Sequence, residues 1–219
     1  MAYGLLFDYL NGQCIEAYKY FGAHFETREV KEIITIPLKK DPSKTKHSSR
    51  KKLIEGVVFR LYAPAASDVS VIGDWNGWDP TIHKMNKVDD SGVFEIFIEG
   101  LHNYSFYKYH FRNARGEYVD KADPFAFLSE YRPGSCSRLF NINGFIWHDT
   151  PYLKQRSRNF DAPMSIYEMH LGSWKGKVDG RNLSYEEIAD YLIPYLKETG
   201  FTHIEIMPIT QYPFDGSWG

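Results

Sequence analysis

Apolar positions between residues 51 and 150 come in short runs that turns separate. Three such runs cover 57–64, 69–75 and 104–113. A fourth run, GVFEIFIEG at 92–100, alternates strictly, so that Phe94, Ile96 and Ile98 share one face of a strand. Short strands at this spacing predict an antiparallel β-sandwich of the immunoglobulin-like kind over 51–150.

The pattern is weaker before the sandwich. Residues 10–22, LNGQCIEAYKYFG, favour a short helix that Gly22 would close, and the apolar segment 30–36 favours a strand. Residues 39–52 hold seven Lys/Arg and one acid, which is typical of a solvated, mobile linker. A phosphate- or partner-binding patch is the alternative. We therefore expect residues 1–50 to be an N-terminal helix and a basic linker.

After residue 160 the pattern changes to strand, helix and strand. The first strand is SIYEMHLGSW at 165–174, and the second is FTHIEIMPI at 201–209. Between them, Ser184 and Glu187 form a capping-box pattern, an apolar stripe follows, and Gly200 ends the helix. One β-α-β unit of this kind predicts parallel strands with a right-handed crossover.

Two parallel strands cannot bury both of their faces. The expectation is therefore that 160–219 is the truncated start of a larger α/β domain, whose other strands are missing. The alternative is a small α/β appendage on the sandwich.

Composition narrows the class of protein. Apolar residues make up 43% and charged residues 25%, as in ordinary globular proteins, and no apolar run reaches the ~20 residues of a membrane span. The N-terminus lacks the pattern of a signal peptide, so we expect a cytoplasmic protein that does not bind membranes. A net charge of −2 argues against a nucleic-acid partner, and Cys14 and Cys136 fit reduced thiols better than a disulfide framework.

Aromatic residues make up 16% of the chain, and two tryptophans lie in the turn GDWNGWD at 73–79. Turn chemistry explains the Gly, Asn and Asp residues of this stretch but not the two large rings. A large aromatic core is one interpretation. A surface that stacks on sugar rings is the other.

Six stretches of the chain form a recognisable set: GAH at 22–24, FRLYAPAASDVSVIGDWNGWD at 59–79, KADPFAF at 121–127, RPGSCSRLF at 132–140, SIYEMHLGSW at 165–174 and the whole of 183–219. Together they resemble the 1,4-α-glucan (glycogen/starch) branching enzymes of the α-amylase superfamily. The family usually has Trp at Tyr62 and Phe at Trp75. The trehalose-releasing trehalohydrolases resemble the chain less closely.

The resemblance implies a glycogen-binding-type module followed by a (β/α)8 TIM barrel, of which 160–219 would be the first β-α-β. It implies glycosyl transfer from an α-1,4 to an α-1,6 linkage, with glycogen, starch or amylose as the glucan partner and no cofactor. The family's catalytic carboxylates lie on later barrel strands, so no catalytic residue and no metal site is expected in this chain.

The same resemblance nominates the binding residues. The Trp of the NGW turn matches Trp78, the Lys of YKY matches Lys108, and an aromatic after the next turn matches Tyr118. Trp75 is a further candidate, although the family's Phe at that position is expected to be buried. Packing of these residues against the barrel is the competing interpretation.

Two further residues, Asp215 and Trp218, are expected to border the substrate cleft of the complete enzyme.

Glu168 and Glu205 form a tempting carboxylate pair for retaining glycosyl transfer, which needs two carboxyl groups about 5–5.5 Å apart. Both are expected in the middle of strands, whereas barrel enzymes use residues at the C-terminal strand ends. His170 and His203 are likewise expected to be hydrogen-bonded barrel residues rather than metal ligands.

Three functional hypotheses therefore stand. The chain is the N-terminal part of a branching enzyme and inactive alone, or a non-catalytic glucan-binding or regulatory module, or part of a trehalohydrolase-like hydrolase. A reading frame that continues past FDGSWG into further barrel strands favours the first hypothesis, and a stop codon there favours the second. The residues that follow Trp218 decide the third.

Overall fold

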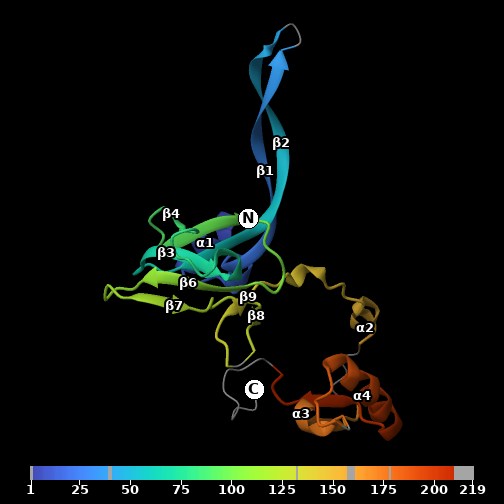
Figure 1. Cartoon of the computed structure of the whole chain (residues 1–219). Helices are drawn as coiled ribbons and strands as arrows, with labels where there is room; N and C mark the ends of the chain where they lie inside the picture. The colour runs from blue at the N-terminus through green and yellow to red at the C-terminus, as the bar shows by residue number, and fades with distance from the viewer. Residues whose placement is uncertain (1, 39–40, 132, 157–160, 178, 210–219) are drawn as a thin grey trace. The chain divides into compact units, whose positions relative to one another are not determined.

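The structure is a computed structural model that describes residues 2–38, 41–131, 133–156, 161–177 and 179–209. It divides into two compact bodies, Met1–Ile146 and Trp147–Gly219, which are described separately below (Figure 1). Among the described residues, no helix is both long enough and apolar enough to cross a membrane.

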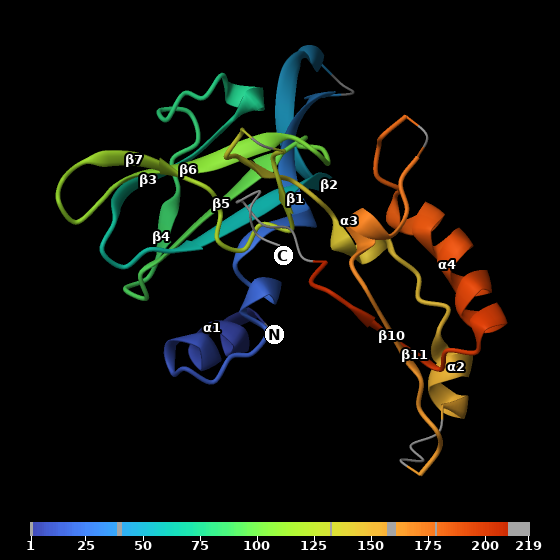
Figure 2. The same cartoon turned by 90° about the horizontal axis from the view of Figure 1, so that it is seen from below.

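The first body contains two antiparallel sheets. The first sheet has the order β1 (Gly22–Leu38), β2 (Asp41–Tyr62), β5 (Val93–Glu99) and β4 (Asn86–Val88). The second has the order β3 (Ser67–Gly73), β6 (Phe106–Arg112), β9 (Ser137–Arg138) and β8 (Leu128–Ser129), and β7 (Tyr118–Lys121) also pairs with β6. Figure 2 shows β3, β6 and β7 as neighbours in this second sheet.

One apolar core joins the two sheets. It takes Phe94 and Ile98 from β5, as the alternation predicted, and Val71, Tyr107 and Tyr109 from the second sheet. Ile96 packs against the same core. The prediction of an antiparallel β-sandwich is therefore confirmed, because alternate residues of both sheets bury one face.

The basic segment is not the mobile linker that its composition predicted. Residues 41–52 form the first half of β2, which pairs with β1 in register from Gly22↔Arg60 to Pro37↔Thr45. The outer halves of the two strands project from the rest of the first body (Figure 1). The β1 and β2 backbones pair along this segment, and two of its cations reach acids on β1: Lys51 Nζ lies 2.9 Å from a Glu29 oxygen, and Arg50 pairs with Glu32.

The predicted helix over 10–22 is also wrong. The helix, α1, spans Ala2–Leu10, and a turn and a single 3-10 turn (η1, Ala17–Lys19) follow. Gly22 begins β1 rather than ending a helix. The side chain of Phe21 explains the difference, because it is fully buried in a cluster with Leu6 and Val93 and so fixes the chain's entry into the sheet.

The second body contains the predicted β-α-β unit. Its strands β10 (Ile166–Met169) and β11 (His203–Ile206) pair in parallel, and α4 (Tyr185–Thr199) packs on them through Ile188 and Leu192. Two short helices, α2 (Thr150–Gln155) and α3 (Leu171–Trp174), complete it.

The helix boundaries of α4 follow the sequence signals. Ser184 Oγ accepts a hydrogen bond from Glu187 N–H, Glu187 accepts one from Ser184 N–H, and Gly200 ends the helix at φ +76°. The first strand is shorter than predicted, since residues 171–174 form α3 instead of continuing it.

A buried carboxylate fixes the inner face of β6. Asp123 Oδ2 accepts hydrogen bonds from the hydroxyls of Tyr107 (2.7 Å) and Tyr109 (3.1 Å), and Oδ1 accepts one from Phe125 N–H. Ser137 Oγ accepts the Asp123 N–H. Burial raises the pKa of Asp123, which these hydrogen bonds oppose, and burial together with the Asp123 charge raises the pKa of both tyrosines.

This raised pKa predicts a pH-dependent stability. Because the folded chain holds the Asp123 proton more tightly, the contribution of Asp123 to the free energy of unfolding falls as pH rises from 3.8 through the raised pKa. Urea unfolding at several pH values measures this. The free energy of unfolding of wild type minus that of Asp123→Asn should decrease across this window. A difference that grows with pH would contradict the assignment.

Candidate functional site

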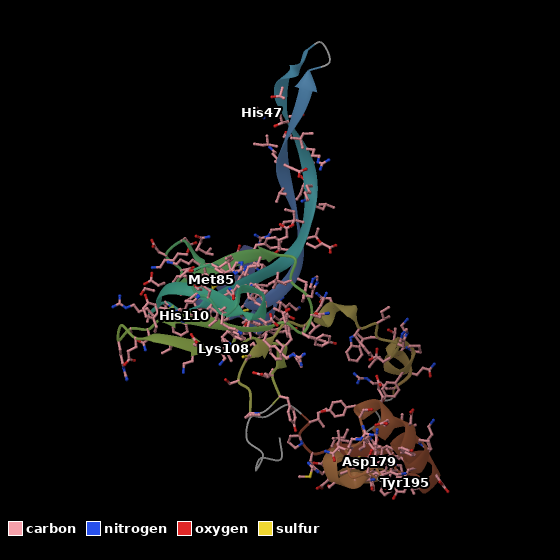
Figure 3. The ribbon with its side chains drawn as sticks, viewed as in Figure 1. His47, Met85, Lys108, His110, Asp179 and Tyr195 are labelled. Carbon is pink, nitrogen blue, oxygen red and sulfur yellow. The ribbon has the colours of Figure 1, made fainter. Side chains whose placement is uncertain are left out.

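The outer face of β6 carries the polar candidates. Tyr107 and Tyr109 point into the core, so Phe106, Lys108 and His110 point outward from the same strand. Figure 3 shows Lys108 and His110 in the second sheet of the first body.

Tyr118 joins this face from β7. It stands opposite Arg112 in the register, and its ring stacks on His110 with centroids 5.1 Å apart and planes at 11°. His110 Nδ1 lies 2.7 Å from Asp120 Oδ1, which holds the imidazole in place beneath the tyrosine. The Tyr118 side chain remains 58% exposed, so a stacking surface faces solvent.

Lys108 is held by a loop that sequence reasoning missed. Its Nζ donates to Ser135 Oγ at 2.9 Å. Glu130 accepts the Cys136 N–H at 3.0 Å, which holds this loop and keeps the pKa of the Glu130 carboxyl below its usual range. Ser135 lies within RPGSCSRLF, one of the stretches that carry the resemblance, and that was the available signal. Cys136 and Cys14 are both free thiols.

The tryptophan turn is built around one buried amide. Asn76 Oδ1 accepts the Gly73 N–H at 2.9 Å, and Nδ2 donates to Val71 C=O at 3.0 Å. Nδ2 also lies 2.9 Å from His83 Nδ1, and burial lowers the pKa of that imidazole. The carboxylate of Asp74 then accepts the Phe106 N–H at 3.1 Å, which ties the turn to β6.

The two tryptophans have different surroundings. Trp78 is 39% exposed and has φ +63°, a left-handed conformation that costs a non-glycine residue roughly 1–2 kcal/mol. Trp75 packs against the core beside Phe59, and within the described structure its buried Nε1 has no hydrogen-bond partner. In this turn the Trp78 side chain is therefore exposed to solvent, whereas the Trp75 side chain packs against the core.

The cleft-border candidates, Asp215 and Trp218, lie outside the described residues. Glu168 and Glu205 stand directly opposite each other in the middle of β10 and β11, as expected. The histidines make local hydrogen bonds: His170 Nδ1 lies 3.0 Å from Ser173 Oγ, and His203 Nδ1 lies 2.8 Å from Thr202 Oγ1. No cluster of metal-ligating side chains occurs in the part of the chain that the structure describes.

A family comparison agrees with this geometry. Residues 46–126 match carbohydrate-binding module 48 (isoamylase N-terminal domain). The matched region lies within the first body and covers β3, β6 and the tryptophan turn.

Curated relatives identify the protein more closely. The chain is 40% identical over 210 residues to the 1,4-alpha-glucan branching enzyme GlgB of Desulfitobacterium hafniense, covering 95% of this chain and 30% of that enzyme. It is 46% identical over 171 residues to GlgB of Gloeobacter violaceus, covering 76% and 23%. Over most of its length the chain is similar to the N-terminal part of the GlgB branching enzymes, and it spans less than a third of the length of these relatives.

Solved structures give the same fold. An alpha amylase structure from Salmonella typhimurium matches with a TM-score of 0.54 at 26% identity, over 75% of this chain and 25% of that one. A Klebsiella pneumoniae pullulanase complexed with maltotriose matches with a TM-score of 0.50 at 23% identity, over 72% and 17%. Both of these proteins are longer than this chain.

The amide at the centre of the tryptophan turn makes a testable contribution. Asn76→Ala leaves the Gly73 N–H and the Val71 C=O without their partners, so the free energy of unfolding of the first body should fall by about 1–3 kcal/mol. Urea unfolding followed by tryptophan fluorescence measures this, with the exposed Asn86→Ala as control. A loss no larger than that of the control would show that the turn holds without Asn76.

Proposed function

We propose that the first body binds an α-1,4-glucan through Trp78, Lys108 and Tyr118. One observation carries the proposal: a half-exposed tryptophan is held in a strained backbone conformation on a turn that is anchored to the strand bearing Lys108. Strain of this kind persists only where the surrounding structure enforces it, and it concentrates at functional sites.

The chemistry of these groups suits a neutral sugar chain. A glucose ring has an apolar face of C–H bonds that an indole or phenol ring can cover, and the indole N–H is able to donate to a hydroxyl. The Lys108 ammonium, already bonded to Ser135, supplies further donors to sugar hydroxyls. Tyr118 is pre-oriented by His110, so little side-chain entropy is lost on binding.

For the longer protein we propose 1,4-α-glucan branching, with glycogen, starch or amylose as substrate in the cytoplasm. In this proposal the second body begins a (β/α)8 barrel, and later strands supply the nucleophile and the acid/base carboxyls. The identity to GlgB enzymes over most of this chain supports it. A retaining transfer also needs a site that excludes water, so that a sugar hydroxyl outcompetes it.

Replacing the exposed tryptophan tests the binding role. Trp78→Ala in the full chain should weaken co-sedimentation with glycogen by at least several-fold, because losing one aromatic platform costs about 1–3 kcal/mol. Trp147→Ala is the matched control, since Trp147 is also exposed but lies in the second body. Equal retention of wild type and Trp78→Ala would overturn this assignment.

A second test concerns catalysis. The 219-residue chain should leave the iodine absorbance of amylose unchanged, because the proposed catalytic carboxyls belong to strands outside it. Branching by this chain would refute the proposed division of labour. If the chain binds glycogen but a longer protein that contains it shows no branching activity, the regulatory-module alternative is favoured. If that longer protein releases trehalose, the trehalohydrolase-like alternative is favoured.

A further inference from the structure

A second aromatic cluster lies at the Phe106 end of the same face, away from Tyr118. Tyr104 precedes β6 and is 53% exposed, and its φ of +75° is a strained value for an aromatic residue. Its backbone is locked by a 2.7 Å hydrogen bond from Tyr104 N–H to Leu139 C=O. Phe140 packs against the Tyr104 ring with centroids 5.9 Å apart. The candidate site described above uses none of these residues.

An arginine organises this cluster. Arg138 on β9 stands opposite Phe106 in the register, and its guanidinium lies 4.9 Å from the Phe106 ring centroid and 5.2 Å from the Tyr104 ring centroid. Its Nε donates to Tyr104 C=O at 3.3 Å. The guanidinium is therefore fixed between two rings, and its terminal N–H groups keep donor capacity at the surface.

The cluster continues the candidate glucan site without a break. Phe106, Lys108 and His110 are alternate residues on the outer face of β6, so neighbouring side chains are about 6.6–6.8 Å apart along the strand. Tyr118 marks one end of this line, Lys108 with Ser135 marks the middle, and Arg138 marks the other end. The tryptophan turn meets β6 at Phe106 through the Asp74 carboxylate.

We propose that Tyr104, Arg138 and Phe106 form a second glucan subsite, which extends the Trp78–Lys108–Tyr118 site to longer α-1,4-linked chains. The inference rests on the proposed binding function of that site. The exposed Tyr104 ring covers the apolar face of a sugar, and the Arg138 guanidinium donates to two hydroxyls of the same or the next residue. A neutral sugar chain is the ligand because aromatic rings alternate along this face with the Lys108 and Arg138 side chains, whose N–H groups donate to sugar hydroxyls.

Ligand length separates the two subsites experimentally. Maltotriose and maltoheptaose are titrated into the full chain by calorimetry, with wild type beside Tyr104→Gly, Tyr104→Phe and Trp78→Ala. Glycine suits φ +75°, so Tyr104→Gly removes the ring and relieves the backbone strain. Tyr152→Ala, an exposed tyrosine of the second body, is the matched control.

The expected result is a length-dependent loss. Tyr104→Gly should weaken maltoheptaose binding by about fivefold to tenfold and leave maltotriose binding within about twofold, which corresponds to the loss of one stacking contact. Tyr104→Phe should bind as wild type does. Trp78→Ala should weaken the binding of both ligands.

The outcomes distinguish the two proposals. If wild type binds both sugars and Tyr104→Gly binds maltoheptaose equally well, the second subsite is refuted and the first stands. If wild type binds neither sugar, the binding function and the subsite fail together. Arg138→Lys keeps the charge but loses the planar fork, so it should weaken the binding of maltoheptaose alone. A cooperative urea transition with the wild-type slope shows that this variant is folded.

Discussion

The buried carboxylate of Asp123 accepts hydrogen bonds from both tyrosines on the inner face of β6, and the position of that strand depends on this contact. A buried carboxyl is costly unless its lone pairs are occupied, and here the two hydroxyls and the Phe125 N–H donate to the Asp123 carboxylate. The tyrosines in turn need an acceptor, because each is almost fully buried in an apolar core.

The hydrogen bonds of Asp123 inside the core also determine which side chains of β6 point outward. Fixing Tyr107 and Tyr109 on one side fixes Lys108 and His110 on the other, since successive side chains point in opposite directions. His110 then positions Tyr118, and Lys108 engages Ser135. The surface proposed to bind sugar is thus rigid for a reason that lies inside the core, which is the property a stacking surface needs to lose little entropy on binding.

Sequence reasoning predicted the elements whose signals are local or periodic. The alternation of Phe94, Ile96 and Ile98 and the capping box of Ser184 and Glu187 depend on neighbours in the chain, so the sequence alone contains them. The errors came from long-range partners. Residues 41–52 look like a linker because their composition does not show that they pair with β1. The N-terminal helix was misplaced because Phe21 packs in one cluster with Val93, far along the chain.

The same division holds for the site. Trp78 and Lys108 were predicted from motifs, and the structure adds why Trp78 is exposed. The Asn76 side chain is hydrogen-bonded to Gly73 and Val71, and the left-handed backbone of Trp78 directs its own ring away from the core. Arg138 lies in RPGSCSRLF, but nothing in the sequence indicates its contact with Tyr104, because that contact arises only when β9 pairs with β6. A chain of repeated sugar units can meet both clusters at once, so two weak subsites on one strand combine through effective concentration rather than through a single deep pocket. Flat, fixed aromatic surfaces along one strand therefore fit a polymeric ligand better than a small isolated one.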